Sequence, residues 1–424
     1  MANFETNAMT LPGGANAVSK EELYQQIKRV CFDRVINMPP DVSDDVVHEI
    51  VSGIVFEHTR RVYLNVVERS SLETSIFNSL RRLGPLQPIL EDASVTEIMV
   101  NGPNHVFIER YGRMELTNVK FESESELLNI INRIVKDVGR EVNQSTPIVD
   151  ARLKDGSRVN IVLPPVSLVG PVITIRKFPS KAMSMEQLLD WGAINEDAAN
   201  FINKLVRAKY NIFIAGGTGS GKTTFLNALS NFIPSDERII TIEDSAELQI
   251  SGPLNLISLE TRNATAAGGT EISMRDLIKS SLRMRPDRIV VGEVRGSEAF
   301  DMLQAMNTGH DGSLSTGHAN STADMLSRLE TMILSGADFP LDAIRQQIAS
   351  SLDIIVYLGR LRDKSRRMLE MCEVLDYRAG NIVLNKLYEF REDSQDAKGR
   401  VRGDHARVGE LQNLKKMRAA GLAP

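Results

Sequence analysis

The spacing of apolar residues changes along the chain, and each change marks a predicted domain. Between residues 19 and 83 apolar side chains recur every three to four residues, which is the spacing of helices. The positions that define this spacing are Leu23, Ile27, Val30, Val46, Val47, Ile50, Ile54, Leu72, Ile76 and Leu80. Pro39 and Pro40 separate the first two helices, because proline cannot continue a helix. The preceding residues 1–18 lack periodicity and are predicted to form a disordered tail.

After Gly84 and Pro85 the apolar positions alternate with polar ones, as they do in β-strands. Strands are predicted at 97–101, 105–109 and 113–116, and again at 148–152, 157–163 and 172–177 after a helix at 124–138. Short turns containing glycine separate neighbouring strands, which favours an antiparallel sheet. Residues 84–180 are therefore predicted to form an α+β domain.

From residue 183 onward helices alternate with continuously apolar strands, which predicts a parallel sheet covered on both faces. A helical stretch at 183–209 precedes strands at 211–215, 238–242, 289–292, 312–315 and 353–358, with an antiparallel edge at 368–375 and 382–390. Residues 181–392 are thus predicted to form an α/β domain. The charged residues 393–424 are expected to be a frayed tail or a weak docking segment.

Composition narrows the class of protein. With 424 residues, 42% hydrophobic and 25% charged, the chain is expected to be a soluble protein of several domains. A net charge of −5 gives no general attraction for nucleic acid, so no direct nucleic-acid partner is expected. Cys31 and Cys372 are the only cysteines, too few for a disulfide framework or a four-thiolate zinc site. No predicted segment spans a membrane, so we expect a cytoplasmic protein that reaches membranes through partners.

A phosphate-binding loop lies between a predicted strand and a predicted helix. The sequence Gly216, Gly217, Thr218, Gly219, Ser220, Gly221, Lys222, Thr223 matches G-x-x-x-x-G-K-[ST]. Glycines let backbone N–H groups converge on phosphate oxygens, and the helix N-terminus favours negative charge. We predict that Lys222 bridges the β- and γ-phosphates of ATP and that the Thr223 hydroxyl ligates Mg²⁺. Thr224 completes the predicted nucleotide-binding segment.

Carboxylates follow two of the apolar strands of the same predicted sheet. Glu293 ends the strand that begins at Ile289, where it is expected to polarise the attacking water or support the metal. Glu243 and Asp244 end another strand, and either is a candidate to hold Mg²⁺ through water, with Glu243 also a catalytic candidate. The alternative for each is a solvated carboxylate at a strand end.

Two histidines flank a short predicted strand in a loop rich in Gly, Ser and Thr. His310 precedes this strand and His318 follows it. A histidine beside a γ-phosphate can donate a hydrogen bond that exists only before hydrolysis. His318 is the better sensor candidate because it lies at the carboxyl end of the strand.

Arginines are expected near the nucleotide because charge develops on the transferred phosphoryl group. Arg152 and Arg158 lie around a predicted hairpin of the α+β domain, and Arg176 lies nearby in the sequence. Arg295 follows Glu293 by two residues. The residues alone favour solvated charges at all four positions.

Taken in order, these motifs resemble the secretion ATPases that power type II and type IV secretion and type IV pili. The four matching segments are the P-loop, an Asp box at Glu243 and Asp244, the strand ending at Glu293 and a His box ending at His318. The residues Arg285, Pro286, Asp287 and Arg288 and the His box are most similar to the CpaF-type ATPases of Tad/Flp pili. The scarcity of cysteine favours the Tad/Flp or the conjugation-type branch, since many type II and pilus-extension relatives carry a four-cysteine zinc module.

The resemblance implies a RecA-like P-loop ATPase domain preceded by a PAS-like α+β domain and an N-terminal helical domain. It implies a homohexamer that docks to inner-membrane platform proteins and extends, or also retracts, a pilus. Arg152 and Arg158 match arginines that approach the γ-phosphate in this family. A conjugation-type or type IV secretion ATPase is the alternative, and a scaffold that binds ATP without hydrolysis is disfavoured by the intact Lys222, Thr223, Glu293 and His318.

Overall fold

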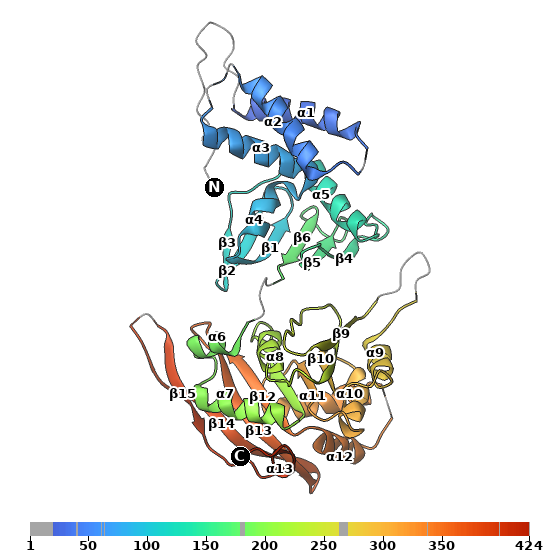
Figure 1. The fold of residues 1–424 in the computed structure, drawn as a ribbon, viewed down its shortest axis with the longest axis vertical. Coiled ribbons are helices and arrows are strands. Elements are labelled where there is room, and N and C mark those ends of the chain that lie inside the picture. Colours follow the sequence, from blue (N-terminus) through green and yellow to red (C-terminus); the bar gives the residue numbers. More distant parts are fainter. Residues whose placement is uncertain are drawn as a thin grey trace. The chain divides into compact units, whose positions relative to one another are not determined.

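The structure of the chain is a computed structural model. It describes residues 20–39, 41–60, 62, 64–178, 183–262, 270–336, 338–397 and 399–423, so the predicted tail at 1–18 lies outside the described residues. The chain divides into two compact units, Met1–Pro179 and Ser180–Pro424, as drawn in Figure 1.

The first unit begins with three helices, as the spacing of apolar residues predicted. They are α1 (Lys20–Ile36), α2 (Asp44–Thr59) and α3 (Val66–Arg81). Ser43 and Asn65 cap the last two through side chains that accept backbone N–H groups, satisfying donors that a helix start leaves unpaired. The helices share a core of their own, which includes Ile27, Val51, Val55 and Ile76.

A six-stranded antiparallel sheet follows the short helices η1 (Gly84–Leu86) and α4 (Gln87–Glu91) in the same unit. Its strands are β1 (Val95–Asn101), β2 (Val106–Arg110), β3 (Arg113–Leu116), β4 (Ile148–Arg152), β5 (Arg158–Val162) and β6 (Val172–Arg176), in the order β3-β2-β1-β6-β5-β4. Helix α5 (Glu124–Asp137) packs its apolar face on the sheet. Lys28 of α1 pairs with Glu122, just before α5, and with Glu126 in its first turn, at 2.6 and 3.0 Å. These ion pairs connect the three helices to the domain that contains the sheet.

The second unit contains a nine-stranded sheet whose order is β15-β14-β13-β12-β7-β11-β10-β8-β9. The parallel strands are β7 (Ile212–Gly216), β8 (Arg238–Glu243), β9 (Asn255–Glu260), β10 (Arg288–Val294), β11 (Leu314–Gly317) and β12 (Ile354–Arg360). An antiparallel extension of β13 (Arg366–Arg378), β14 (Asn381–Gln395) and β15 (Val401–Arg407) continues from β12. The predicted α/β architecture of this domain is confirmed.

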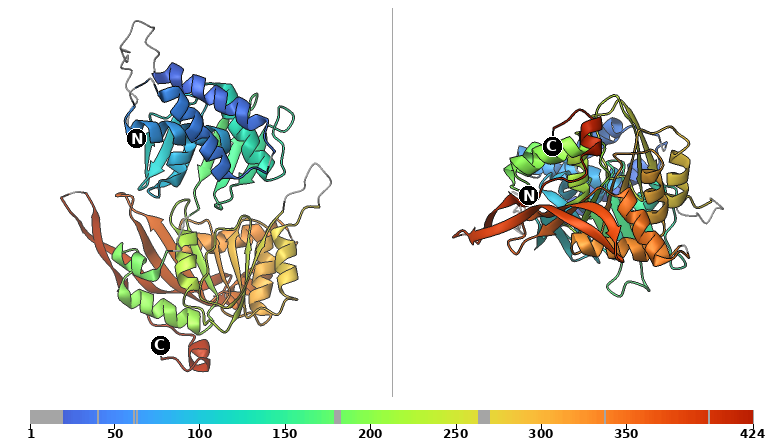
Figure 2. Two further views of the ribbon diagram at one scale, coloured as in Figure 1. Left: turned by 45° about the horizontal axis from the view of Figure 1, so that its top comes forward. Right: turned by 90° about the horizontal axis from the view of Figure 1, so that it is seen from below.

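Helices cover both faces of this sheet (Figures 1 and 2). One face carries α6 (Met185–Asp190), α7 (Glu196–Arg207) and α8 (Lys222–Ser230), and the other carries α9 (Met274–Ser281), α10 (Glu298–Asn307), α11 (Thr322–Leu334) and α12 (Leu341–Ser351). The predicted single helix at 183–209 is two helices, because the chain turns at Gly192 with φ +65°. Strand β9 was not predicted, since its side chains are mostly exposed or half-buried at a sheet edge and lack a strong apolar pattern.

The expectation of a frayed tail at 393–424 was wrong. Strand β14 runs to Gln395, β15 pairs with it, and a short helix α13 (Lys415–Ala419) follows. The segment has few buried apolar side chains, which include Val401, Leu411 and Met417. Many of the surrounding charges are paired, as in Lys416 with Asp311, so the charged composition does not prevent ordered packing. No helix of the described chain has the length and apolar character needed to cross a membrane.

Candidate active site

The predicted phosphate loop joins β7 to α8. Every residue of β7 is buried, and the strand delivers the chain to Gly216. A side chain at Gly216 would lie 2.5 Å from Ser220 Oγ and 2.6 Å from the Leu358 carbonyl oxygen, so only glycine fits there. Gly219 and Gly221 have φ of +69° and +96°, which also favours glycine. No side chain caps α8, so its first N–H groups remain available for an anion.

Lys222 lies at the start of α8 with its side chain only 8% exposed. Its Nζ is 3.3 Å from the Gly217 carbonyl oxygen and 3.4 Å from His318 Nδ1. Burial lowers the pKa of Lys222, while the charge of Glu293 acts to raise it. The Lys222 ammonium therefore lies beside the loop, where a bound phosphate would supply its negative counter-charge.

Parallel pairing brings Glu293 and His318 to the same edge of the sheet. Strand β11 lies between β7 and β10, with Gly317 opposite Ala215 on one side and opposite Val294 on the other. His318 Nε2 is 2.7 Å from Glu293 Oε1, so the histidine lies between the carboxylate and Lys222. Burial and the nearby Lys222 lower the pKa of His318 below 6.5. A neutral ring can accept a hydrogen bond from the Lys222 ammonium at Nδ1.

Arg295 extends this cluster on the side away from Lys222. Its Nη2 donates to Glu293 Oε2 at 2.7 Å, and its Nη1 lies 3.8 Å from Asp244 Oδ2. The carboxylate of Glu293 is thus held between a histidine and an arginine at the carboxyl end of β10. Such a fixed carboxylate can accept a proton from water placed beside the phosphate loop.

The two carboxylates after β8 occupy different environments. Glu243 is 3% exposed, and its Oε1 accepts hydrogen bonds from the backbone N–H groups of Glu247 and Leu248 at 2.8 and 3.0 Å. Asp244 is exposed and accepts a hydrogen bond from Thr261 Oγ1 at 2.9 Å. Glu243 therefore organises the loop that follows β8, and its catalytic role stays a prediction. Asp244 remains accessible to a hydrated metal.

The residues present are compatible with Mg²⁺ that arrives with a nucleotide. Among the described residues no group of three or more His, Cys, Asp or Glu side chains could hold a metal by itself. Mg²⁺ bound to nucleotide needs only one or two protein ligands, because phosphates and water fill its other positions. Thr223, in the first turn of α8, and Asp244 can supply them. Ser220 Oγ is buried in the loop and has no hydrogen-bond partner among the described residues, so the loop can offer this hydroxyl to a polar ligand.

The predicted arginines of the first unit form one row. Arg152 on β4 lies opposite Arg158 on β5, which lies opposite Arg176 on β6. Opposite residues of antiparallel strands share a face, so three guanidinium groups project together. Arg176 donates from Nε to Glu97 Oε1 at 2.8 Å, and Arg152 donates from Nε to the Gly156 carbonyl oxygen at 3.3 Å. Adjacent like charges are unfavourable in a sheet, so this row is typical of an anion-binding surface.

Two arginines of the site were not assigned to it from the sequence. Arg295 was considered a solvated charge, although its position after Glu293 was a signal. Arg366 of β13 donates from Nε to the Gly219 carbonyl oxygen at 2.8 Å. No linear motif could identify Arg366, because 147 residues separate it from that glycine. The weaker candidate, His310, has its Nδ1 3.2 Å from the carbonyl oxygen of Ala305 in α10.

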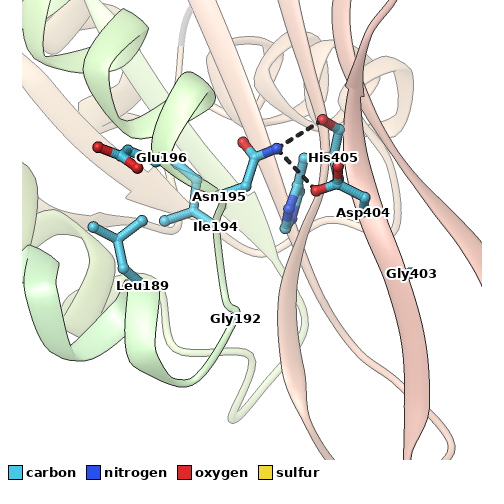
Figure 3. Close-up of a pocket in the computed structure, with 8 residues that line it drawn as sticks. All are labelled: Leu189, Gly192, Ile194, Asn195, Glu196, Gly403, Asp404 and His405. Atoms are coloured by element: carbon cyan, nitrogen blue, oxygen red, sulfur yellow. Dashed lines mark hydrogen bonds between the residues drawn. The ribbon is translucent and has the colours of Figure 1, made fainter.

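A separate cavity of about 310 Å³ lies between the turn preceding α7 and strand β15. Its lining includes Asn195, Glu196, Asp404 and His405 (Figure 3). Asn195 Nδ2 donates to Asp404 Oδ1 and to the His405 carbonyl oxygen, at 2.9 and 3.0 Å. None of the predicted site residues lines this cavity, so the phosphate-loop cluster remains the candidate active site.

The parallel sheet, the phosphate loop and the carboxylate beside it define a P-loop nucleotide-binding enzyme. The particular family follows from comparison with known proteins. Residues 79–409 match the family described as "Type II/IV secretion system protein", and the chain belongs to this family. The family match, together with the phosphate loop and the carboxylate beside it, identifies this chain as an ATPase.

Individual relatives agree with this membership. A putative conjugal transfer protein of Mycobacterium tuberculosis is 34% identical over 313 residues, covering 70% of this chain and 88% of the relative. The type IV secretion system protein VirB11 of Bartonella quintana is 32% identical over 322 residues, covering 67% of this chain and 90% of the relative. The Legionella pneumophila ATPase DotB shares the fold, with a TM-score of 0.50, 21% identity and coverage of 68% of this chain and 79% of DotB.

Proposed function

We propose that this ATPase is a homohexameric motor that drives assembly of Tad/Flp type IV pili through inner-membrane platform proteins. It would work in the cytoplasm, held at the membrane by those partners. The observation that carries the proposal is the continuous cluster from Lys222 through His318 and Glu293 to Arg295 beside the phosphate loop. The N-terminal helices, most of which precede the family match at residue 79, support the Tad branch by resemblance.

A conjugation-type or type IV secretion motor is the second candidate. The names of relatives that are 32–34% identical favour it, since they refer to conjugal transfer and type IV secretion. The two candidates share the chemistry of the site and differ in what the motor moves. Deleting the gene and measuring surface pili, conjugation frequency and secreted protein side by side separates them: loss of pili alone supports the first candidate, and loss of DNA or protein transfer alone supports the second.

In the proposed reaction a water molecule attacks the γ-phosphorus of ATP, and the bond from that phosphorus to the bridging oxygen of ADP breaks. Glu293 orients the water and takes its proton. Lys222 and the N–H groups of the loop meet the negative charge of the phosphates. Mg²⁺, held by Thr223 and through water by Asp244, would neutralise charge on the β- and γ-phosphates. His318, with Nε2 facing Glu293, reports whether the γ-phosphate is present.

The arginine row of the first unit is proposed to complete this site. Arg152, Arg158 and Arg176 would meet the phosphates across a domain or subunit gap and stabilise charge that develops during transfer. Three guanidinium groups on one face of neighbouring strands support this assignment. Arginine suits the task because its planar donors match phosphate oxygens.

Steady-state ATPase activity and oligomeric mass test the proposal together, for the native chain and for Lys222→Ala, Glu293→Gln and Arg158→Ala. We expect a hexamer that depends on Mg²⁺ and ATP, and loss of hydrolysis in all three variants. Glu293→Gln should still bind ATP, since it removes a proton acceptor and keeps the shape of the side chain. Turnover that survives Glu293→Gln would contradict the catalytic assignment. A chain that stays monomeric and inactive with its membrane partner present would contradict the motor.

A further inference from the structure

The hairpin that joins β12 to β13 is strongly basic and lies beside the phosphate loop. Its basic residues are Arg360, Arg362, Lys364, Arg366 and Arg367, with Asp363 as the only acidic residue among them. Strand β12 pairs in parallel with β7, and Leu358 lies opposite Gly216. The carboxyl end of β12, where the hairpin starts, therefore reaches the same edge of the sheet as the loop.

Arg366 is the residue of this hairpin that contacts the loop. Its Nε donates to the Gly219 carbonyl oxygen at 2.8 Å, and its Cδ lies 3.4 Å from the position that a Cβ on Gly221 would take. The side chain thus lies along the loop between its tip and the start of α8. The Nε bond fixes the plane of the guanidinium group, which also fixes the direction of its two Nη groups.

The neighbouring arginines of the hairpin differ from Arg366 in how their terminal amino groups are used. Both Nη groups of Arg362 donate to the Glu392 carboxylate, and Arg367 Nη1 donates to the Trp191 carbonyl oxygen. Within the described parts of the chain, the Nη groups of Arg366 make no hydrogen bond or ion pair. Four N–H donors are therefore presented beside the phosphate loop without an acceptor.

We propose that Arg366 binds the polyphosphate of the nucleotide in the P-loop of its own chain. Its Nε holds the loop in the binding conformation, and its Nη groups donate to phosphate oxygens common to ATP and ADP. The strand order gives the reason: β12 flanks β7 on one side, whereas β11 and β10 lie on the other. His318 follows β11 directly, and Glu293 lies on β10. Arg366 reaches the phosphate loop from the side opposite Glu293. It therefore contributes to nucleotide affinity, and Glu293 acts in the chemical step. The inference rests on the ATPase activity of the chain and not on what the motor moves.

The test compares Arg366→Ala with Arg366→Lys and with the matched control Arg362→Ala, using the full-length chain. From the usual free-energy contribution of a hydrogen bond to a charged group, we expect Arg366→Ala to raise the KM for ATP and the Kd for ADP by about 10- to 100-fold. Because the lost interaction is equal in ground and transition states, kcat should change by less than about threefold. Arg366→Lys should fall between native and Arg366→Ala, since lysine keeps the charge without the planar donors. Arg362→Ala should keep native KM and Kd.

Several results would overturn the inference. A native Kd for ADP in Arg366→Ala excludes it, as does a drop in kcat at unchanged Kd, which would place Arg366 in the chemical step. An equal loss of ADP affinity in Arg362→Ala would assign the effect to the hairpin as a whole. If Arg366→Ala lowers the melting temperature without nucleotide, Arg366→Lys decides: weakened ADP binding by a natively stable Lys variant supports the inference, and native binding excludes it. Lys222→Ala, which should lose ADP binding in any case, separates failure of this inference from failure of the P-loop assignment.

Discussion

At the scale of single residues, the site depends on atoms that approach more closely than most side chains permit. Gly216 illustrates this, because its backbone passes between Ser220 Oγ and the Leu358 carbonyl oxygen. Gly292 is similar, because a Cβ added there would lie only 2.8 Å from Glu243 Cγ. At such positions a small increase in side-chain volume would displace the predicted phosphate loop.

Gly216→Ala should therefore disrupt the loop, whereas Gly217→Ala should not disrupt the fold. An alanine at 216 would overlap two atoms, one of them a backbone oxygen that cannot move away cheaply, and overpacking of this kind costs about 1–3 kcal/mol. At 217 no atom lies within 4 Å of the added methyl. Melting temperature without nucleotide and ADP affinity check this, and equal melting temperatures for the two variants would contradict it.

His405 should make the protein acid-sensitive. It is 5% exposed, with Asp404 and Arg367 as its charged neighbours and the ring of Phe390 5.2 Å away, and burial lowers its pKa from 6.5 to about 4. The lowered value means that folding favours the neutral ring, so its contribution is complete above pH 6.5 and is lost as pH falls toward 4. The shift corresponds to about 3 kcal/mol. His405→Gln should flatten the fall in melting temperature between pH 6.5 and 4.5, whereas His105→Gln, at an exposed position, should not.

At the scale of elements, the C-terminal segment belongs to the sheet that holds the P-loop. The Glu373 carboxylate on β13 accepts backbone hydrogen bonds from Gln412 and Asn413, and the Tyr210 hydroxyl donates to the Asn413 carbonyl oxygen at 2.6 Å. Tyr210 lies immediately before the strand that enters the phosphate loop. The segment thus covers the end of the sheet opposite the active site.

Lys416→Ala should destabilise the second unit. Lys416 Nζ lies 2.7 Å from Asp353 Oδ2, and the same oxygen accepts the Asn211 backbone N–H at 2.7 Å. Burial raises the pKa of Asp353 while Lys416 acts to lower it, so removing the lysine leaves a buried carboxylate without its counter-charge. Because Lys416 is partly exposed, we expect a loss of about 2–3 kcal/mol, somewhat below that of a fully buried pair. Urea unfolding measures it, with the exposed Lys415→Ala as control; equal unfolding midpoints would show that the pair contributes nothing.

At the scale of the whole molecule, the proposed catalytic groups are divided between two units. The P-loop, Glu293 and His318 belong to residues 180–424, and the arginine row belongs to residues 1–179. A hexamer in which one chain supplies arginines to another would make hydrolysis a property of the assembly. This division leads to a test with mixed subunits.

Mixing Lys222→Ala chains with Arg158→Ala chains should restore ATPase activity if the arginines act between subunits. Each variant alone is expected to be inactive. In a mixed ring, an intact P-loop on the Arg158→Ala chain would face an intact arginine row on its Lys222→Ala neighbour. Activity that rises with the mixing ratio and peaks near equal amounts would support action between subunits. No recovery in rings shown by mass to be mixed would place the arginines in the same chain as their nucleotide.

Local patterns in the sequence were sufficient for much of the fold and for the centre of the site. The P-loop was predictable because its residues are contiguous in the sequence. Its glycines are needed where the backbone has a positive φ or lies too close to other atoms for a side chain. Glu293 and His318 were predictable because each follows an apolar strand, and parallel strands end at a common edge. Strands β9 and β15 escaped prediction, because β9 has no fully buried residue and β15 has only two, which gives a weak periodic signal.

The sequence by itself therefore determined the kind of sheet, the phosphate loop and the residues placed at the ends of its strands. Only the tertiary structure decided that Arg366 bonds to Gly219, that Arg295 holds Glu293, and that three arginines form one row. The contact of Arg366 with Gly219 joins residues 147 positions apart, and the arginine row depends on the register of three strands. Strand order and register arise only when the whole chain buries its apolar surface, so these contacts have their physical cause in the folded protein. Arg295 and Glu293 are close in the sequence, but the direction of their side chains is likewise fixed only by folding.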